Sequence, residues 1–136
     1  MSKKVVSISA DDTLRIVGEI MKLGHVRHLP VVRRGELVGV VSQRDLLRAS
    51  LSNVMGIPRD EQDDFLEGVQ ISDVMSKPPT FVGPEAEVQE AAGLMADRKI
   101  GCLPVVAETG DVVGILTETD VLRYLAGLSL PEPSRR

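Results

Sequence analysis

The sequence has very few cysteines and aromatic residues, and each scarcity excludes a kind of protein. Its 136 residues include one cysteine, no tryptophan, one tyrosine and two phenylalanines. The single Cys102 cannot form a disulfide within the chain, which excludes a disulfide-rich secreted domain and favours a reducing compartment. Hydrophobic residues still make up 43% of the chain, so aliphatic side chains must fill the core.

Long hydrophobic runs and basic stretches are missing as well. No run approaches the roughly 20 apolar residues that cross a bilayer, and the N-terminus leads into a short alternating strand rather than a signal peptide. The formal net charge is −4 and the basic residues are scattered, unlike the basic stripe of a nucleic-acid-binding protein. We therefore expect a soluble protein of the prokaryotic cytoplasm that binds neither nucleic acid nor membrane.

What the sequence does contain is an internal repeat. The segment Leu29–Val32 recurs 74 residues later as Leu103–Val106, with the same Leu-Pro-Val-Val sequence. The segment Gly39–Asp45 recurs 75 residues later as Gly114–Asp120. The one-residue difference falls in the turn between these segments, where insertions are tolerated. An ordered series of matches with its slip in a turn indicates a duplicated unit.

Each copy is predicted to fold as strand, helix, strand, strand, helix. Hydrophobic residues in the first helix recur at positions i, i+3, i+4 and i+7, which is one helix face, and two β-branched segments joined by a glycine-containing turn predict a hairpin. A copy of about 55 residues buries too little surface to fold alone. We therefore expect an α/β fold of the α+β type, with the two repeats packed sheet to sheet in pseudo-twofold symmetry. The helix faces are Leu14, Val17, Gly18 and Met21 in the first copy and Val88, Ala91, Ala92 and Met95 in the second. The strands are expected at Val5–Ile8, Leu29–Val32 and Leu37–Val41, and the second copy starts with Thr80–Val82.

The chain is expected to divide into a first repeat at 1–57, an acidic connector at 58–68, a second repeat at 69–130 and a disordered tail at 131–136. Ile71–Met75 is predicted to be a short helix that opens the second repeat and packs on it. The first repeat lacks this front helix, because Met1 aligns with Met75. Either the natural chain begins without the helix, or its true start lies upstream of Met1.

A hydroxyl residue and an aspartate recur at the predicted end of each hairpin, as Ser42 with Asp45 and as Thr117 with Asp120. A helix start presents unpaired N–H groups and favours an anion, so the hydroxyl can donate to a phosphate there. The aspartate can accept from the two vicinal hydroxyls of a ribose. The alternative is a helix-capping box that needs no ligand.

These motifs, in both copies and in the same order, resemble the cystathionine-β-synthase (CBS) domain family, and two in tandem resemble a Bateman module. The resemblance implies two clefts between the repeats, each able to hold an adenosine-containing ligand, and often a disc-shaped homodimer. Backbone groups before each Leu-Pro strand and a residue of each first strand would line the clefts. The ligand-binding residues expected in this way are Val6, Val26, Arg27, His28, Ser42, Asp45, Met75, Thr80, Ile100, Gly101, Cys102, Thr117 and Asp120.

The two copies differ just before the strand, where the first has Arg27-His28 and the second has Gly101-Cys102. A guanidinium binds phosphate in a bidentate manner, so we expect Arg27 to be the main phosphate anchor; the alternative is a solvated surface arginine. His25 and His28 stand at a helix-to-strand junction without a third ligand nearby, so no metal site is expected. Cys102 is expected to be a small buried filler rather than a reactive thiol.

The expected function is that of a stand-alone regulatory module, which binds AMP, ADP or ATP and signals energy or metabolite state to a protein that the sequence does not identify. The sequence shows no nucleophile beside a base, no paired carboxylates and no Walker-type glycine loop, so neither enzyme activity nor a catalytic cofactor is expected. The alternative is a structural dimerisation module with non-functional clefts.

Overall fold

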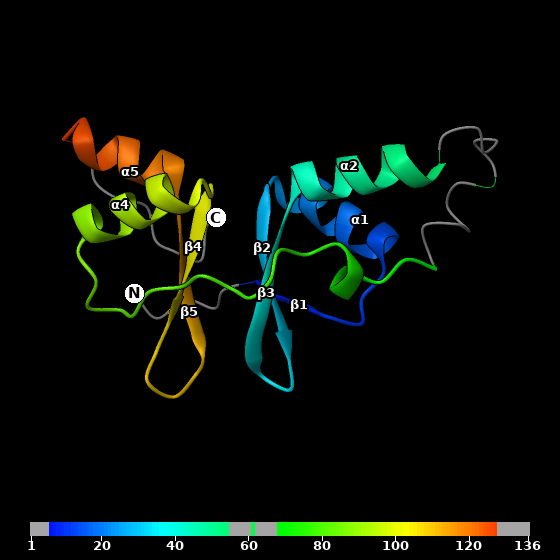
Figure 1. Cartoon of the computed structure of the whole chain (residues 1–136), viewed down its shortest axis with the longest axis horizontal. Coiled ribbons are helices and arrows are strands. Elements are labelled where there is room, and N and C mark those ends of the chain that lie inside the picture. The colour runs from blue at the N-terminus through cyan, green and yellow to red at the C-terminus, as the bar shows by residue number, and fades with distance from the viewer. Residues whose placement is uncertain (1–5, 55–60, 62–67, 128–136) are drawn as a thin grey trace. The chain divides into compact units, whose positions relative to one another are not determined.

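The computed structural model describes residues 6–54, 61 and 68–127. It divides into two compact units, shown in Figure 1. The first-repeat unit contains Ser7–Arg34 and Val38–Pro79, and the second-repeat unit contains Val6, Gly35–Leu37 and the chain from Thr80 onwards. Met1, most of the predicted connector at 58–68 and the predicted tail at 131–136 lie outside the described residues.

The first-repeat unit is built on a small sheet with strand order β1-β2-β3. Strand β1 runs parallel to β2, with Ile8 opposite Val31, and β2 and β3 form the predicted hairpin. The two helices lie beside the strands at the end opposite the hairpin turn (Figure 1). The elements are β1 (Ile8–Ser9), α1 (Leu14–Gly24), β2 (His28–Arg33), β3 (Glu36–Ser42), α2 (Gln43–Val54) and the 3-10 helix η1 (Ile71–Asp73).

Helix α1 shows why this sequence starts and stops a helix where it does. The Thr13 side chain accepts a hydrogen bond from the N–H of Ile16 at 3.4 Å, which satisfies one of the free donors of the first turn. The helix ends at Gly24, and the C-cap residue His25 adopts the left-handed conformation with φ 53°. Three of the four residues of the predicted apolar face, Leu14, Val17 and Met21, are buried, while the fourth, Gly18, is half-buried.

The second-repeat unit repeats the hairpin and its two helices. Strand β4 runs antiparallel to β5, with Cys102 opposite Thr117. The predicted strand at its start is reduced to a single parallel bridge between Val82 and Val105. Glu87 and Glu90 form a capping box at the start of the first helix. The elements are α4 (Val88–Arg98), β4 (Cys102–Val106), β5 (Val112–Thr117) and α5 (Glu118–Leu125).

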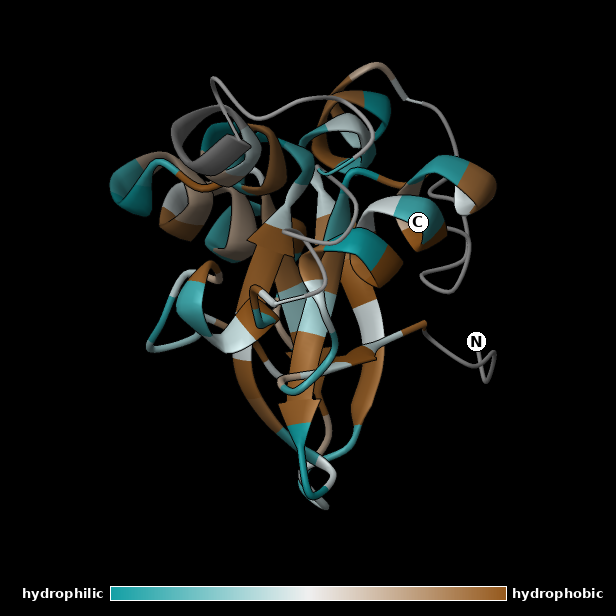
Figure 2. Cartoon of the chain, turned by 90° about the vertical axis from the view of Figure 1, so that its right-hand side faces the viewer, coloured by the Kyte–Doolittle hydropathy of each residue, from teal (hydrophilic) through white to brown (hydrophobic). Residues whose placement is uncertain are grey.

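Each unit has an aliphatic core, and Figure 2 shows hydrophobic strands that end in hydrophilic turns. Leu29 and its counterpart Leu103 are at most 1% exposed, and Cys102 is buried as predicted. The mixed α+β fold class and the order of elements are therefore confirmed. In the described part of the chain, no helix combines the length and the hydrophobicity that crossing a bilayer requires.

The segment Val69–Ser76 packs differently from our expectation. It was predicted to pack on the second repeat, but Ile71 is fully buried in the core of the first-repeat unit. Its backbone is bonded there too: the N–H of Ile71 donates to the Asp12 carbonyl at 2.9 Å, and the N–H of Leu14 donates to the Val69 carbonyl at 2.8 Å. The prediction was wrong because an apolar segment specifies that it must be buried, not on which surface.

Val40 and Ser76 hold the end of this segment to the edge of β3. The N–H of Val40 donates to the Ser76 carbonyl at 3.2 Å, and the N–H of Ser76 donates to the Val40 carbonyl at 2.9 Å. Gly39 lies beside this bridge, where a Cβ atom would come 2.8 Å from the Ser76 carbonyl oxygen and 2.5 Å from the Met75 sulfur. The close approach of the two backbones therefore requires glycine at this position.

We expect Gly39→Ala to lower the free energy of unfolding by about 1–3 kcal/mol, because the new methyl group overlaps a backbone atom that cannot move alone. Chemical denaturation measures the change. Gly18→Ala is the matched control: its Cβ would meet nothing within 4 Å, and alanine favours a helix over glycine by about 1 kcal/mol. Equal stability of wild type and Gly39→Ala would contradict the close contact.

Candidate functional site

Each unit has a strand-to-helix junction at which a strand ends on a hydroxyl residue and a helix begins at the next residue. In the first-repeat unit, β3 ends at Ser42 and α2 begins at Gln43. In the second-repeat unit, β5 ends at Thr117 and α5 begins at Glu118. We call these places the first and the second junction.

At the first junction Ser42 and Asp45 bond reciprocally. The Ser42 N–H donates to Oδ2 of Asp45 at 2.9 Å, and the Asp45 N–H donates to Oγ of Ser42 at 3.0 Å. The capping box is therefore formed, but it leaves one hydrogen-bond donor and one acceptor unused. The Ser42 hydroxyl accepts in this pair, so its proton remains available to donate. Oδ1 of Asp45 has no hydrogen-bond partner among residues 6–54, 61 and 68–127. Both side chains are half-buried.

At the second junction the same box contains one more hydrogen bond. The Thr117 N–H donates to Oδ2 of Asp120 at 2.8 Å, and the Asp120 N–H donates to Oγ1 of Thr117 at 3.3 Å. The Thr117 hydroxyl also donates to Oδ2 of Asp120, at 3.0 Å. Asp120 is only 3% exposed. The hydroxyl proton that is available at Ser42 is therefore engaged at Thr117.

One backbone hydrogen bond in each unit ties the loop before the Leu-Pro strand to the junction. The N–H of Gln43 donates to the Arg27 carbonyl at 2.7 Å, and the N–H of Glu118 donates to the Gly101 carbonyl at 3.1 Å. This bond places the loop, the hydroxyl residue and the aspartate next to one another. Arg27 thus adjoins the Ser42–Asp45 pair and Gly101 adjoins the Thr117–Asp120 pair, with Cys102 opposite Thr117 in the sheet. Val26, His28 and Ile100 are neighbours of these residues in the chain, and their roles at a site remain predictions.

Three predicted site residues are not placed at either junction by a hydrogen bond of the described residues. Met75 is buried in the core of the first-repeat unit, against Gly39. Thr80 is half-buried, and Val6 is 55% exposed. Their roles at a site remain predictions.

The first turn of α2 contains a residue that the sequence reasoning passed over. Arg44 lies between Ser42 and Asp45 in the chain and is exposed. Within the described structure its N–H has no acceptor, so a cation and a free backbone donor occupy the same turn. The signal was present in the sequence, because Arg44 is one of the two residues inside the Ser-x-x-Asp motif.

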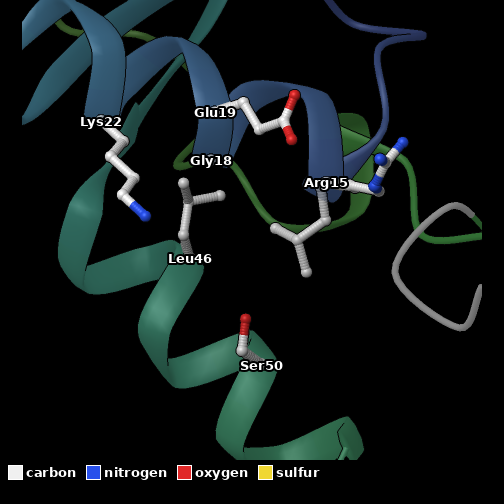
Figure 3. A pocket seen from close by; sticks show the side chains of 7 residues that line it. Arg15, Gly18, Glu19, Lys22, Leu46 and Ser50 are labelled. Carbon is white, nitrogen blue, oxygen red and sulfur yellow. The ribbon is translucent and has the colours of Figure 1, made fainter. Parts of the chain in front are cut away.

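A pocket of about 200 Å³ lies elsewhere, between α1 and α2 (Figure 3). Leu46 and Ser50 of α2 face Gly18 and the charged side chains of α1 across it. None of the predicted site residues lines this pocket, so it is separate from the first junction. Over the residues that can be described, no three His, Cys, Asp or Glu side chains gather as a metal site would need.

Comparison with known families identifies this architecture. The sequence model of the CBS domain matches residues 1–52 and again residues 71–127. The chain belongs to the CBS domain family. Both repeats are CBS domains, so the tandem arrangement inferred from the internal repeat is confirmed.

The chain is similar to part of an enzyme and to nearly the whole of a CBS domain-containing protein. The chain is 33% identical over 119 residues to an inosine-5′-monophosphate dehydrogenase of Korarchaeum cryptofilum, covering 88% of this chain and 22% of that protein. It is 31% identical over 134 residues to a CBS domain-containing protein of Dictyostelium discoideum, covering 98% of this chain and 92% of the relative. Among solved structures, CBSX2 in complex with AMP is 29% identical, with a TM-score of 0.72 over 91% of this chain and 89% of that chain.

Proposed function

We propose that this CBS pair is a regulatory module that binds an adenosine-containing ligand at its junctions. The observation that carries the proposal is the reciprocal bonding of Ser42 and Asp45, which holds a carboxylate at a helix start with Oδ1 turned to no described partner. The 29% identical CBSX2 has been solved with AMP, which supports an adenine nucleotide as the ligand class.

The polar groups of the first junction suit the ribose and the phosphate of such a ligand. Oδ1 of Asp45 can accept from the vicinal hydroxyls of a ribose, since a carboxylate oxygen has two lone pairs. The N–H of Arg44 and the hydroxyl of Ser42 can donate to a phosphate at the positive end of the α2 dipole. The Arg27 carbonyl accepts from the N–H of Gln43, so the Arg27 backbone adjoins this turn, and its exposed guanidinium is proposed as the phosphate anchor.

We propose regulation rather than catalysis, in the cytoplasm, where adenine nucleotides are plentiful and a lone cysteine stays reduced. A ligand shifts an equilibrium only by the difference in its affinity for two states. The regulated equilibrium would be the association of this chain with a second copy or with the protein that it controls. The chain corresponds to 22% of the dehydrogenase that it matches, so such a target can also be a further domain of a longer protein.

A second candidate is a structural dimerisation module, and exposed leucines favour it. Leu47 of α2 is 58% exposed, and its counterpart Leu122 of α5 is 65% exposed, with Leu125 at 74% one turn further on. Apolar side chains that recur at equivalent positions of both repeats suit a surface that a second copy covers. Such a module would dimerise without responding to a nucleotide.

A thermal-shift panel separates the two candidates. AMP, ADP, ATP, NAD, S-adenosylmethionine and cyclic dinucleotides are each added to the full chain, with inorganic phosphate as the control. A ligand at 100 times its Kd should raise the free energy of unfolding by about 2.7 kcal/mol, and we expect this shift with at least one adenine nucleotide. If every compound leaves the melting temperature unchanged, the structural role replaces the regulatory one.

A further inference from the structure

The two junctions present opposite charges to a ligand. Arg27, whose carbonyl is bonded to the start of α2, is replaced at the second junction by Gly101, whose carbonyl makes the same bond to α5. In the first turn, Gln43-Arg44 of α2 is replaced by Glu118-Thr119 of α5. The first junction therefore has two arginines that the second lacks, and the second has a glutamate that the first lacks.

The hydroxyl groups of the two junctions also differ in a way that favours a phosphate at the first junction. Ser42 accepts from the Asp45 N–H, and its own proton is not used by any described residue. Thr117 donates its proton to Oδ2 of Asp120 at 3.0 Å. A phosphate would find a hydroxyl donor ready at the first junction, whereas at the second it would have to break an existing hydrogen bond.

Cations further along the loop do not cancel the difference. Arg98 and Lys99 precede the second junction, but they belong to the last turn and the C-cap of α4, where cations stabilise the helix dipole. The first-repeat unit also has a cation in this position, Lys22 in the last turn of α1. What distinguishes the junctions is therefore the set of residues in direct backbone contact with the helix start.

We propose that the two junctions divide adenosine ligands by charge: the first takes a ligand with a phosphate, and the second takes an adenosine ligand without one. This inference rests on the proposed function and specifies it. A phosphate at the first junction gains charge-assisted hydrogen bonds from a guanidinium, which binds anions through a planar fork. A phosphate at the second junction faces the Glu118 carboxylate in the first turn, where like charges repel.

The experiment compares AMP with adenosine, which share base and sugar and differ only in the phosphate. Asp120→Asn disables the second junction and Asp45→Asn the first, while the amide oxygen can still accept from the backbone N–H and keep the cap. Isothermal titration of the full-length Asp120→Asn variant should give at least about tenfold tighter binding of AMP than of adenosine, the equivalent of one charge-assisted hydrogen bond. The Asp45→Asn variant should bind adenosine at least as tightly as AMP.

Variants that change one charge identify the residue responsible for the preference for AMP over adenosine. In the Asp120→Asn background, Arg27→Gln should remove most of the preference for AMP. Arg34→Gln is the matched control: Arg34 follows β2 in the hairpin turn, at the other end of the strand from Arg27, so its loss changes the net charge equally and should leave the preference intact. In the Asp45→Asn background, Gly101→Arg should create a preference for AMP; Gly101 is not among the described residues with positive φ, so its backbone conformation does not require glycine.

Equal AMP-to-adenosine ratios at the two junctions would overturn the inference while leaving nucleotide binding intact. An equal loss of preference in Arg27→Gln and Arg34→Gln would also overturn it, because the effect would then come from net charge alone. If neither compound binds at either junction, the inference fails, and the proposed function fails with it when no compound of the thermal-shift panel binds either. The melting temperature of each variant shows that it is folded, and the Arg27→Gln result decides the question even if Gly101→Arg does not fold.

Discussion

Replacing Ile71 with alanine should lower the free energy of unfolding by about 2–5 kcal/mol, the range found when a fully buried large aliphatic side chain is truncated. Ile71 is 0% exposed and lies in the core of the first-repeat unit with Leu14 and Val17. The loss should therefore appear in that unit. Chemical denaturation measures its size, and amide hydrogen exchange of Leu14, whose N–H is bonded to the Val69 carbonyl, shows where it occurs.

Ile71→Val is the graded control, because the loss of one methylene group costs only about 0.5–1.5 kcal/mol. Exchange of the α4 amides reports on the second-repeat unit in the same sample. If Ile71→Ala accelerates exchange in α4 and leaves Leu14 protected, the segment belongs to the second repeat, as the sequence pattern suggested, and the packing described above is wrong.

Replacing Asp45 with alanine should weaken binding of an adenine ribonucleotide at the first junction by about a hundredfold. Two hydrogen bonds from ribose hydroxyls to a carboxylate are lost, each contributing about 1.5 kcal/mol or more. The affinity is measured by titration in the Asp120→Asn background, so that the first junction alone is observed. The cap lost with Asp45 costs about 1 kcal/mol of stability, so the titration is made well below the melting temperature of the variant.

The 2′,3′-dideoxy analogue of the same nucleotide is the control for this prediction. It lacks the hydroxyls that Asp45 would bind, so its weaker affinity should be nearly the same with and without the carboxylate. If the dideoxy compound loses as much affinity as the ribonucleotide, Asp45 acts only as a helix cap, and the role in ribose binding must be abandoned.

The capping interpretation and the ligand interpretation of the Ser-x-x-Asp motif turn out to be compatible. A carboxylate has two oxygens, and the cap at the first junction engages only Oδ2 of Asp45. A serine hydroxyl can accept and donate at once, and the cap uses it only as an acceptor. The same bonds that stabilise α2 therefore hold both groups in place before a ligand arrives, which reduces the entropy that binding must offset.

Much of the fold was predictable from the sequence, for a physical reason. The apolar spacing of Leu14, Val17 and Met21 predicted the buried face of α1, because a helix places residues three and four apart on one side. The repeat of the Leu-Pro-Val-Val segment predicted two hairpins, and both are present. The burial of Cys102 was predicted because a free cysteine behaves as a small apolar residue. The reciprocal pairs at Ser42 and at Thr117 match the capping-box alternative given for the motif, whose geometry is local to four residues.

Only the tertiary structure decided where these local pieces are buried. Ile71 is apolar in either arrangement. It packs in the first-repeat unit because the backbone that follows it pairs with the edge of β3, where Gly39 allows the close approach. The bond from Gln43 to the Arg27 carbonyl joins positions 16 residues apart, and no periodicity encodes such a contact. Likewise, the Thr117 hydroxyl donates to Asp120 whereas the Ser42 hydroxyl only accepts from Asp45, a difference that the shared Ser/Thr-x-x-Asp pattern does not predict.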